Sequence, residues 1–192
     1  YHEHLSYLSL KPMITLFDKF NMEIFEVQQR DIHGGSIRCY VRRKLNAGSE
    51  ISNIINDLLQ LEHRSGIYEL PYLKKFAVKV FNHRIKLMTL LKGLKEEGRT
   101  IAGVSAPAKG MTLINYCGIG TDILDFITEK STLKIGRYTP GQRIPIVPDQ
   151  KLIEIQPDYA LILAWNFAEE IMENLRDYSL AGGKFIIPIP EP

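Results

Sequence analysis

The stretch from Ile101 to Cys117 carries the residues of this sequence that are best placed for chemistry. Its first four residues are apolar, small residues and a proline follow, and after Lys109 and Gly110 the pattern becomes helical. A strand, a tight turn and a helix form the opening of a βαβ unit. Such a turn leaves backbone N–H groups at the helix N-terminus without partners, at the sheet edge where anions and nucleotides bind. Because Lys109 adds a positive charge, the stretch predicts a phosphate or pyrophosphate site. A well-packed turn without a ligand is the alternative.

The turn does not match the glycine-rich motifs that bind phosphates in other folds. A P-loop needs its lysine after a glycine and before serine or threonine, whereas Lys109 precedes Gly110 here. The dinucleotide fingerprint needs a second glycine where this chain has Ser105, and a nucleophile elbow needs glycine where Pro107 stands. Glu129 follows the next expected strand, where an acid would bind ribose in a nicotinamide oxidoreductase. The missing fingerprint counts against that class.

The first four residues, Tyr1-His-Glu-His4, are all polar and protonatable. In a loop, His4 is suited to act as a general base near neutral pH, with Glu3 or Tyr1 orienting it. The spacing is not that of a zinc-binding His-Glu-x-x-His motif, so no metal site is expected. A solvated loop without a catalytic role is the alternative.

Further polar residues fall where the strands and the first helix of the expected sheet end. Asn115 and Tyr116 lie on the helix after the turn and either contact a ligand or cap and pack. Arg137 and Tyr138 lie in a glycine-flanked loop, where an arginine can hold a phosphate with two hydrogen bonds. Asn166 follows an apolar strand at the same edge of the sheet. A lone arginine in a loop is more often exposed and without a role, but the number of polar residues at the carboxyl strand ends favours a ligand site.

Composition places the chain among globular proteins without a strongly charged partner. It has 192 residues, of which 45% are hydrophobic and 24% charged, with a net charge of +2, so neither nucleic acid nor a membrane is an expected partner. Cys39 and Cys117 lie in apolar patterns and are expected to be free thiols in the cytoplasm. Because the chain does not begin with methionine, we expect it to be a fragment or a trimmed form of a longer protein.

The expected elements form an antiparallel hairpin, two helices and a parallel sheet. Ser9 is expected to cap the first helix, and the hairpin spans 22–30 and 36–43. Two helices follow, around 51–61 and 71–94, the second with a lysine-rich, solvated face. Beyond Gly98, apolar strands alternate with helices, which predicts a small doubly wound, mostly parallel α/β domain over 99–192. Its strands are expected at 101–104, 122–128, 144–147, 159–165 and 184–188, with a helix at 167–178.

Several segments, in this order along the chain, resemble the sugar C-methyltransferase family, which depends on S-adenosylmethionine. The resemblance rests on Tyr1-His-Glu-His-Leu-Ser-Tyr7, His33-Gly-Gly-Ser-Ile-Arg38, Ser105-Ala-Pro-Ala-Lys-Gly110, Asn115-Tyr-Cys117, Gly136-Arg-Tyr-Thr-Pro-Gly141, Ile144-Pro-Ile-Val147, Pro157-Asp-Tyr159 and Gly182-Gly-Lys-Phe185. The chain departs from the family pattern at Met111 and at 128–132, which bears on the identity of the nucleotide and sugar.

The resemblance implies a zinc module, a central methyltransferase domain and a C-terminal domain that binds a nucleotide-sugar. Residues 1–44 would be the tail of the central domain, 45–98 a helical linker and 99–192 the Rossmann-like nucleotide-sugar domain. S-adenosylmethionine would be bound by a domain absent from this chain, so the chain alone is expected to be inactive. The missing N-terminal domains of the same protein are an expected partner.

The resemblance also implies roles for individual residues. His4 would remove the proton next to a keto group, supported by Tyr1 and Glu3. Ala106 to Gly110 and Arg137 would border one pocket that faces this histidine. A binding or docking module without catalysis is the alternative. The expected substrate-binding residues are Ser105, Ala106, Pro107, Lys109, Gly110, Asn115, Tyr116, Arg137, Tyr138 and Asn166.

Overall fold

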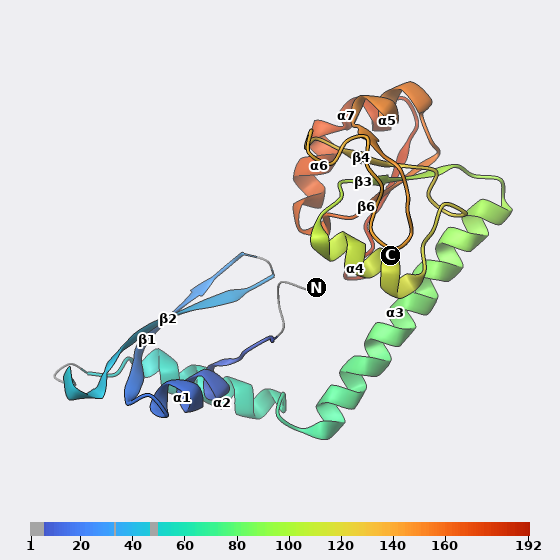
Figure 1. Ribbon diagram of the computed structural model, residues 1–192. Helices are drawn as coiled ribbons and strands as arrows, with labels where there is room; N and C mark the ends of the chain where they lie inside the picture. Colours follow the sequence, from blue (N-terminus) through green and yellow to red (C-terminus); the bar gives the residue numbers. More distant parts are fainter. Residues whose placement is uncertain (1–5, 33, 47–49) are drawn as a thin grey trace. The chain divides into compact units, whose positions relative to one another are not determined.

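The computed structural model describes residues 6–32, 34–46 and 50–192 (Figure 1). The chain divides into two compact units, one that ends at Val78 and one that runs from Lys79 to Pro192. The division falls within α3 (Leu70–Glu96), a helix of 27 residues. Each unit has a hydrophobic core of its own.

The N-terminal unit is a two-stranded antiparallel hairpin with helices packed on one face. Apolar side chains of both strands, among them Ile24 and Val27 on either side of an irregularity in β1, form a core with Leu10, Ile55 and Leu58 of the helices. The hairpin has the bounds that the alternation in the sequence predicts. The elements of this unit are α1 (Leu10–Asp18), β1 (Met22–Arg30), β2 (Ser36–Arg43), the 3-10 turn η1 (Lys44–Asn46), α2 (Asn53–Ser65) and the first part of α3.

Helix α1 begins against α2 instead of on a cap of its own. The Ser9 side chain makes no capping hydrogen bond; its Oγ lies 2.8 Å from the hydroxyl of Tyr68. The N–H groups of Leu10 and Lys11 donate instead to the carboxylate of Glu62, the second at 3.1 Å. A carboxylate at this end of a helix also interacts favourably with the helix dipole. Ser9 thus occupies the N-cap position, as predicted, but it makes no side-chain capping bond, because a residue distant in sequence satisfies these donors.

The C-terminal unit is built on a five-stranded sheet with β3 at its centre. The strand order is β5-β4-β3-β6-β7, and every neighbouring pair is parallel. This arrangement confirms the predicted doubly wound α/β fold. The strands are β3 (Ile101–Val104), β4 (Ile127–Glu129), β5 (Ile146–Pro148), β6 (Tyr159–Ile162) and β7 (Lys184–Ile186).

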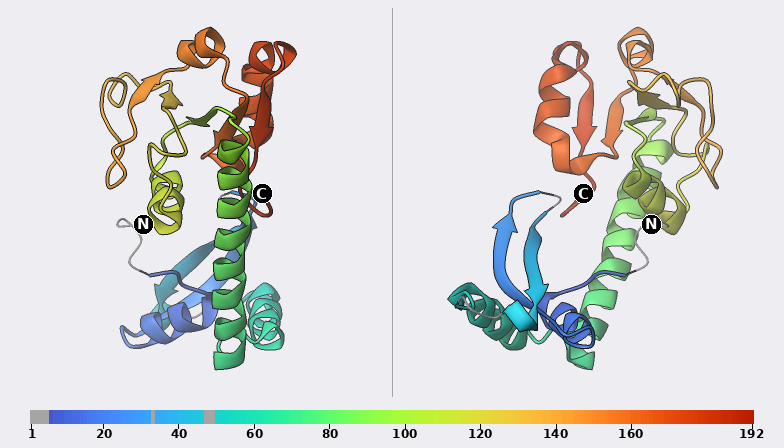
Figure 2. Two further views of the ribbon diagram at one scale, coloured as in Figure 1. Left: turned by 90° about the vertical axis from the view of Figure 1, so that its right-hand side faces the viewer. Right: turned by 60° about the vertical axis from the view of Figure 1, so that its left-hand side comes forward.

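Helices cover both faces of this sheet (Figure 2). On one face, Ile101, Ile127 and Leu161 pack with α3 and α4. On the other face, Ala102 and Ala160 pack with residues of the last three helices. Because successive side chains of a strand point to opposite faces, the near-continuous apolar runs serve both cores. The helices are α4 (Ala108–Cys117), α5 (Gln150–Ile155), α6 (Ala168–Asn174) and α7 (Arg176–Leu180), with the 3-10 turn η2 (Trp165–Phe167) ahead of α6.

Several predicted boundaries in this unit were wrong: the strands expected at 144–147 and 159–165, for example, cover 146–148 and 159–162. The strand expected at 122–128 is only Ile127–Glu129, because the preceding residues form a turn in which Ile123 and Leu124 donate to Gly120. Both are buried, so their apolar character serves the core and not a strand. The helix expected at 167–178 is two short helices that meet at Leu175. Burial alone does not separate these conformations in a sequence.

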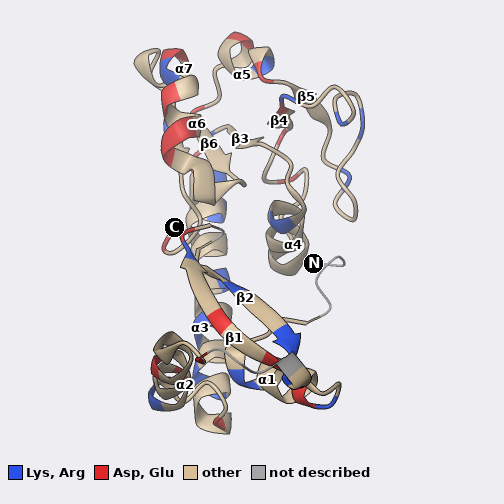
Figure 3. Cartoon of the chain, turned by 90° about the vertical axis from the view of Figure 1, so that its left-hand side faces the viewer, with Lys and Arg blue, Asp and Glu red and all other residues tan. Residues whose placement is uncertain are grey.

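The lysines of α3 are exposed except Lys95, which is half-buried and whose ammonium lies 3.7 Å from the carboxylate of Asp125; Figure 3 shows the basic residues along this helix. In the C-terminal unit, its opposite side contributes Leu87, Leu91 and Leu94 to the core. Among the described residues, no helix combines the length and apolar character needed to cross a membrane.

Gly110 lets α4 lie directly against the end of β6. A Cβ atom added at this position would lie 2.8 Å from Leu163 Cβ and 3.1 Å from the Leu163 carbonyl oxygen. A contact with backbone cannot be relieved by a rotamer change, so the helix would have to move.

We expect Gly110→Ala to destabilise the chain by about 1–3 kcal/mol, the usual cost of overpacking. The matched control is Gly93→Ala, in α3, where an added Cβ meets no atom within 4 Å. The control should gain roughly 0.5–1 kcal/mol, because alanine is the better helix former. Urea unfolding of the two variants measures both changes. Equal effects of the two substitutions would contradict the close packing at Gly110.

Candidate functional site

The order of strands in the sheet reverses between β3 and β6. The chain leaves β3 through α4 on one face of the sheet, and it leaves β6 towards α6 and α7 on the other. The carboxyl ends of these strands are neighbours, since Val104 pairs with Ile162. In open α/β sheets, ligands bind outside the carboxyl ends of the strands at such a switch point. The turn at 105–110 and the segment at 165–167 both lie here.

The turn after β3 is held from the side of β4. Ser105 has a left-handed backbone with a φ of 66°, and its N–H donates to the Thr128 carbonyl at 2.8 Å. The Ala106 N–H donates to the Glu129 carboxylate at 3.0 Å. The amide of Ala106 is thus already used within the protein. Pro107 has no N–H and its carbonyl accepts the first bond of α4, from Met111 at 3.1 Å.

Glu129 is surrounded by hydrogen-bond donors of its own chain. One of its oxygens accepts from the N–H groups of Lys130 and Ser131 at 2.9 and 3.1 Å. The other accepts from Ala106 and from the ammonium of Lys134, the latter at 3.1 Å. Burial by itself raises the pKa of Glu129, but the hydrogen bonds and the Lys134 charge outweigh it and lower the pKa below its usual value. The carboxylate is therefore ionised and engaged near neutral pH.

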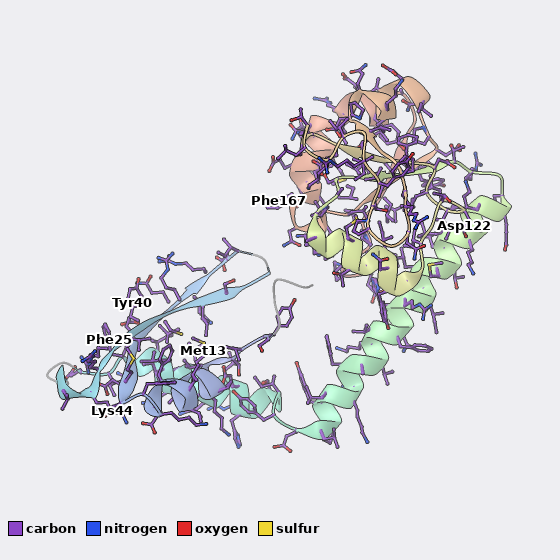
Figure 4. The ribbon with its side chains drawn as sticks, in the orientation of Figure 1. Met13, Phe25, Tyr40, Lys44, Asp122 and Phe167 are labelled. Carbon is purple, nitrogen blue, oxygen red and sulfur yellow. The ribbon has the colours of Figure 1, made fainter. Side chains whose placement is uncertain are left out.

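Lys109 points to the other side of the turn, towards η2. Its ammonium lies 5.0 Å from the ring centre of Trp165 and 5.7 Å from that of Phe167, which is labelled in Figure 4. Partial burial lowers the pKa of Lys109. Within the described residues, Lys109 forms no ion pair with an acid. The result is a partly desolvated cation beside two aromatic rings at the switch point.

Asn115 and Tyr116 make contacts within the protein. The Asn115 amide donates to the Met111 carbonyl at 2.8 Å and to the Pro140 carbonyl at 3.2 Å, which ties α4 to the long loop before β5. Tyr116 lies with its ring 5.6 Å from the guanidinium of Arg84 on α3. These contacts match the capping and packing interpretation of both residues.

The remaining predicted residues are not brought together with Lys109 by a contact. The side chains of Arg137 and Tyr138 are exposed, and the Arg137 backbone bonds to Lys134 and Ile146. Asn166 is exposed within η2, where it lies between Trp165 and Phe167 in the sequence. The candidate base and its supports, Tyr1, Glu3 and His4, lie outside the described residues.

Two cavities are found away from the switch point. One, of about 600 Å³, lies between α3 and the C-terminal end of α4 and includes Arg84, Met88 and Cys117. The other, of about 670 Å³, lies in the N-terminal unit beside Phe25. Neither includes Lys109 or Arg137, so the shared pocket expected from the sequence stays a prediction. Among the described residues, no group of three or more His, Cys, Asp or Glu is arranged to hold a metal ion.

Three contributors to this site were not recognised as such in the sequence. In the sequence, Trp165 and Phe167 stand at the end of an expected strand and at the start of an expected helix, and aromatic residues directly after a buried strand are a usable signal. Lys134 stands five positions after Glu129 and was assigned only to a polar turn. Their contacts with the turn at 105–110 span 28 or more positions, beyond the range of any local pattern.

Comparison with known proteins agrees with the resemblance found in the sequence. A family described as the C-methyltransferase C-terminal domain matches residues 31–190. The C-methyltransferase NovU of Streptomyces niveus is 38% identical over 192 residues, which is 100% of this chain and 46% of NovU. The chain thus spans about half the length of the curated relative that it matches. On this evidence, the chain belongs to the C-methyltransferase family and carries that family's C-terminal domain.

Proposed function

We propose that this chain is the C-terminal part of an S-adenosylmethionine-dependent C-methyltransferase that acts on a keto sugar linked to a nucleotide. Membership of the family supports the methyltransferase class. The nucleotide-linked sugar is our extension, and it rests on the switch point of the sheet. That position suits a phosphorylated ligand in folds of this kind.

The observation that carries the proposal is the environment of Lys109. A partly buried ammonium without an acidic partner among the described residues can form charge-assisted hydrogen bonds to a diphosphate. The neighbouring amides of Ala108 to Gly110 precede the first intrahelical bond of α4, from Met111, and so lie at the positive end of its dipole. Trp165 and Phe167 add apolar faces on which a base or sugar ring can pack.

His4 is proposed as the base, on the strength of the Tyr-His-Glu-His motif. A neutral imidazole accepts the proton from the carbon next to the keto group, and the bond electrons pass into the enolate. The enolate carbon is then a nucleophile. S-adenosylmethionine, when bound, supplies an electrophilic methyl group on a sulfonium. Tyr1 and Glu3 would keep the imidazole oriented.

The switch point of this chain does not fit S-adenosylmethionine itself. The turn lacks a glycine-rich loop, and the acid in the position that commonly holds a ribose, Glu129, is already bonded to four donors of its own chain. We therefore assign the methyl donor to a part of the enzyme other than this site. The alternative of a binding module without catalysis uses the same ligand site and lacks only the role of His4.

Lys109→Met should weaken the binding of nucleoside diphosphates about tenfold, because it removes a charge-assisted hydrogen bond. The matched control is Lys184→Met, since Lys184 also lies over a ring, 5.7 Å from the centre of Tyr159, but at the start of β7. Calorimetry with uridine, thymidine and guanosine diphosphates measures both. Equal binding by the wild-type chain and the Lys109 variant would remove the ligand site from the proposal.

Methyl transfer should be undetectable when residues 1–192 alone are mixed with labelled S-adenosylmethionine and a nucleotide-linked 4-keto-6-deoxy sugar. The physical reason is that the switch point offers no place for the methyl donor. Transfer of label to the sugar is the measurement. Turnover above the background of a His4→Gln control would contradict the assignment of the donor to another part of the enzyme.

A further inference from the structure

Glu129 and Lys134 together bind both backbone polar groups of Ala106, in the turn after β3. The Glu129 carboxylate accepts from the Ala106 N–H at 3.0 Å, and the Lys134 ammonium donates to the Ala106 carbonyl at 3.0 Å. The two side chains also form an ion pair with each other, at 3.1 Å. Both polar groups of residue 106 are thereby held by β4 and the loop that follows it. We call Glu129 and Lys134 the clasp.

The clasp lies at the position where the sheets of dinucleotide-binding folds bind a ribose. In dinucleotide-binding folds, an acid after the second strand accepts hydrogen bonds from the ribose hydroxyls. Glu129 ends β4, directly beside β3, and thus holds the equivalent position. A carboxylate offers about four acceptor sites, and four donors of the chain already fill them here. Its side chain is only 12% exposed.

The clasp also gives the two sides of the turn opposite character. On the β4 side, the Ala106 amide already donates to a carboxylate that is paired with Lys134, so a phosphate there would find neither that amide free nor an unpaired cation. On the β6 side, Lys109 presents a cation between the turn and two aromatic rings. An anionic ligand is therefore directed to the β6 side.

From these contacts we propose that Glu129 and Lys134 are positioning residues that fix the conformation of the β3–α4 turn. They thereby direct a diphosphate to Lys109, and Glu129 does not bind the ribose of the ligand. This inference rests on the proposed function, because it concerns the same ligand site. It goes beyond the proposed function in two ways: it assigns the conformation of the turn to an internal salt bridge, and it excludes ribose recognition by the acid after the second strand.

The first experiment measures the clasp without a ligand. Amide hydrogen exchange at Ala106 should accelerate at least tenfold in Glu129→Gln and in Lys134→Met, whereas Lys134→Arg should retain most of the protection. Amides of β6 that pair with β3 serve as internal references for global stability, and their rates should not change. Unchanged exchange at Ala106 in both disruptive variants would overturn the clasp. If Glu129→Gln does not fold, Lys134→Met and Lys134→Arg still decide the question.

The second experiment separates positioning from ribose recognition. Calorimetry compares uridine diphosphate with 2′-deoxyuridine diphosphate on the wild-type chain and on Glu129→Gln. A positioning role predicts that the variant weakens both nucleotides by the same factor, about fivefold, and that the wild-type chain does not discriminate through this residue. A loss confined to uridine diphosphate would show that Glu129 reads the ribose and would overturn the inference.

The two experiments keep this inference distinct from the proposed function. If neither nucleotide binds the wild-type chain, the proposed function fails at this site, and the direction of a diphosphate to Lys109 fails with it. The exchange rates still decide whether Glu129 and Lys134 hold the turn. If the nucleotides bind and Ala106 exchange is unaffected by the variants, the proposed function survives and the clasp is overturned.

Discussion

The close approach of α4 to the end of β6 is the constraint on which the C-terminal unit depends. Residue 110 has no side chain, and any Cβ atom there would collide with Leu163. Because the helix lies so near, the preceding residue, Lys109, reaches the rings of Trp165 and Phe167 across the switch point. The close packing of Gly110 against Leu163 therefore also determines where Lys109, the one charged side chain of the turn, lies.

The turn between β3 and α4 has a carboxylate on one side, that of Glu129, and an ammonium group on the other, that of Lys109. Glu129 is saturated by donors of its own chain, while Lys109 has only aromatic neighbours as partners within the described residues. Both charged groups are partly buried, but only the Lys109 ammonium is left without an acidic partner among the described residues and so is available to a ligand. Under the proposed function, a ligand that carries negative charge therefore binds on the side of Lys109. The turn therefore differs from that of dinucleotide-binding sheets, in which the acid after the second strand binds the ribose.

The N-terminal unit uses the same device at a helix end. The first N–H groups of α1 donate to the carboxylate of Glu62 on α2, as the Ala106 N–H does to Glu129. In both places a backbone donor that is open to a local cap or a ligand in other proteins is instead bonded to an acid from another element. Such bonds fix one element relative to the next, because a buried donor left without a partner is costly.

Local pattern in the sequence determined which segments form strands and helices, and it determined the class of fold. The alternation at 22–30 and 36–43 defines the hairpin, and the apolar runs at 101–104 and 159–162 define a sheet that is buried on both faces. These are properties of neighbouring residues, so a sequence contains them directly. The apolar segment before β4 misled the prediction because core residues can be buried in a turn as well as in a strand.

Tertiary structure alone decided which partners the chemical groups have. Nothing near Lys109 in the sequence indicates that two rings more than fifty positions away will lie against it, or that Glu129 will bond to the Ala106 amide and not to a ligand. The same holds for Glu62 at the start of α1. A sequence pattern records periodicity along the chain, whereas the partner of a polar group depends on which elements the folded core brings together.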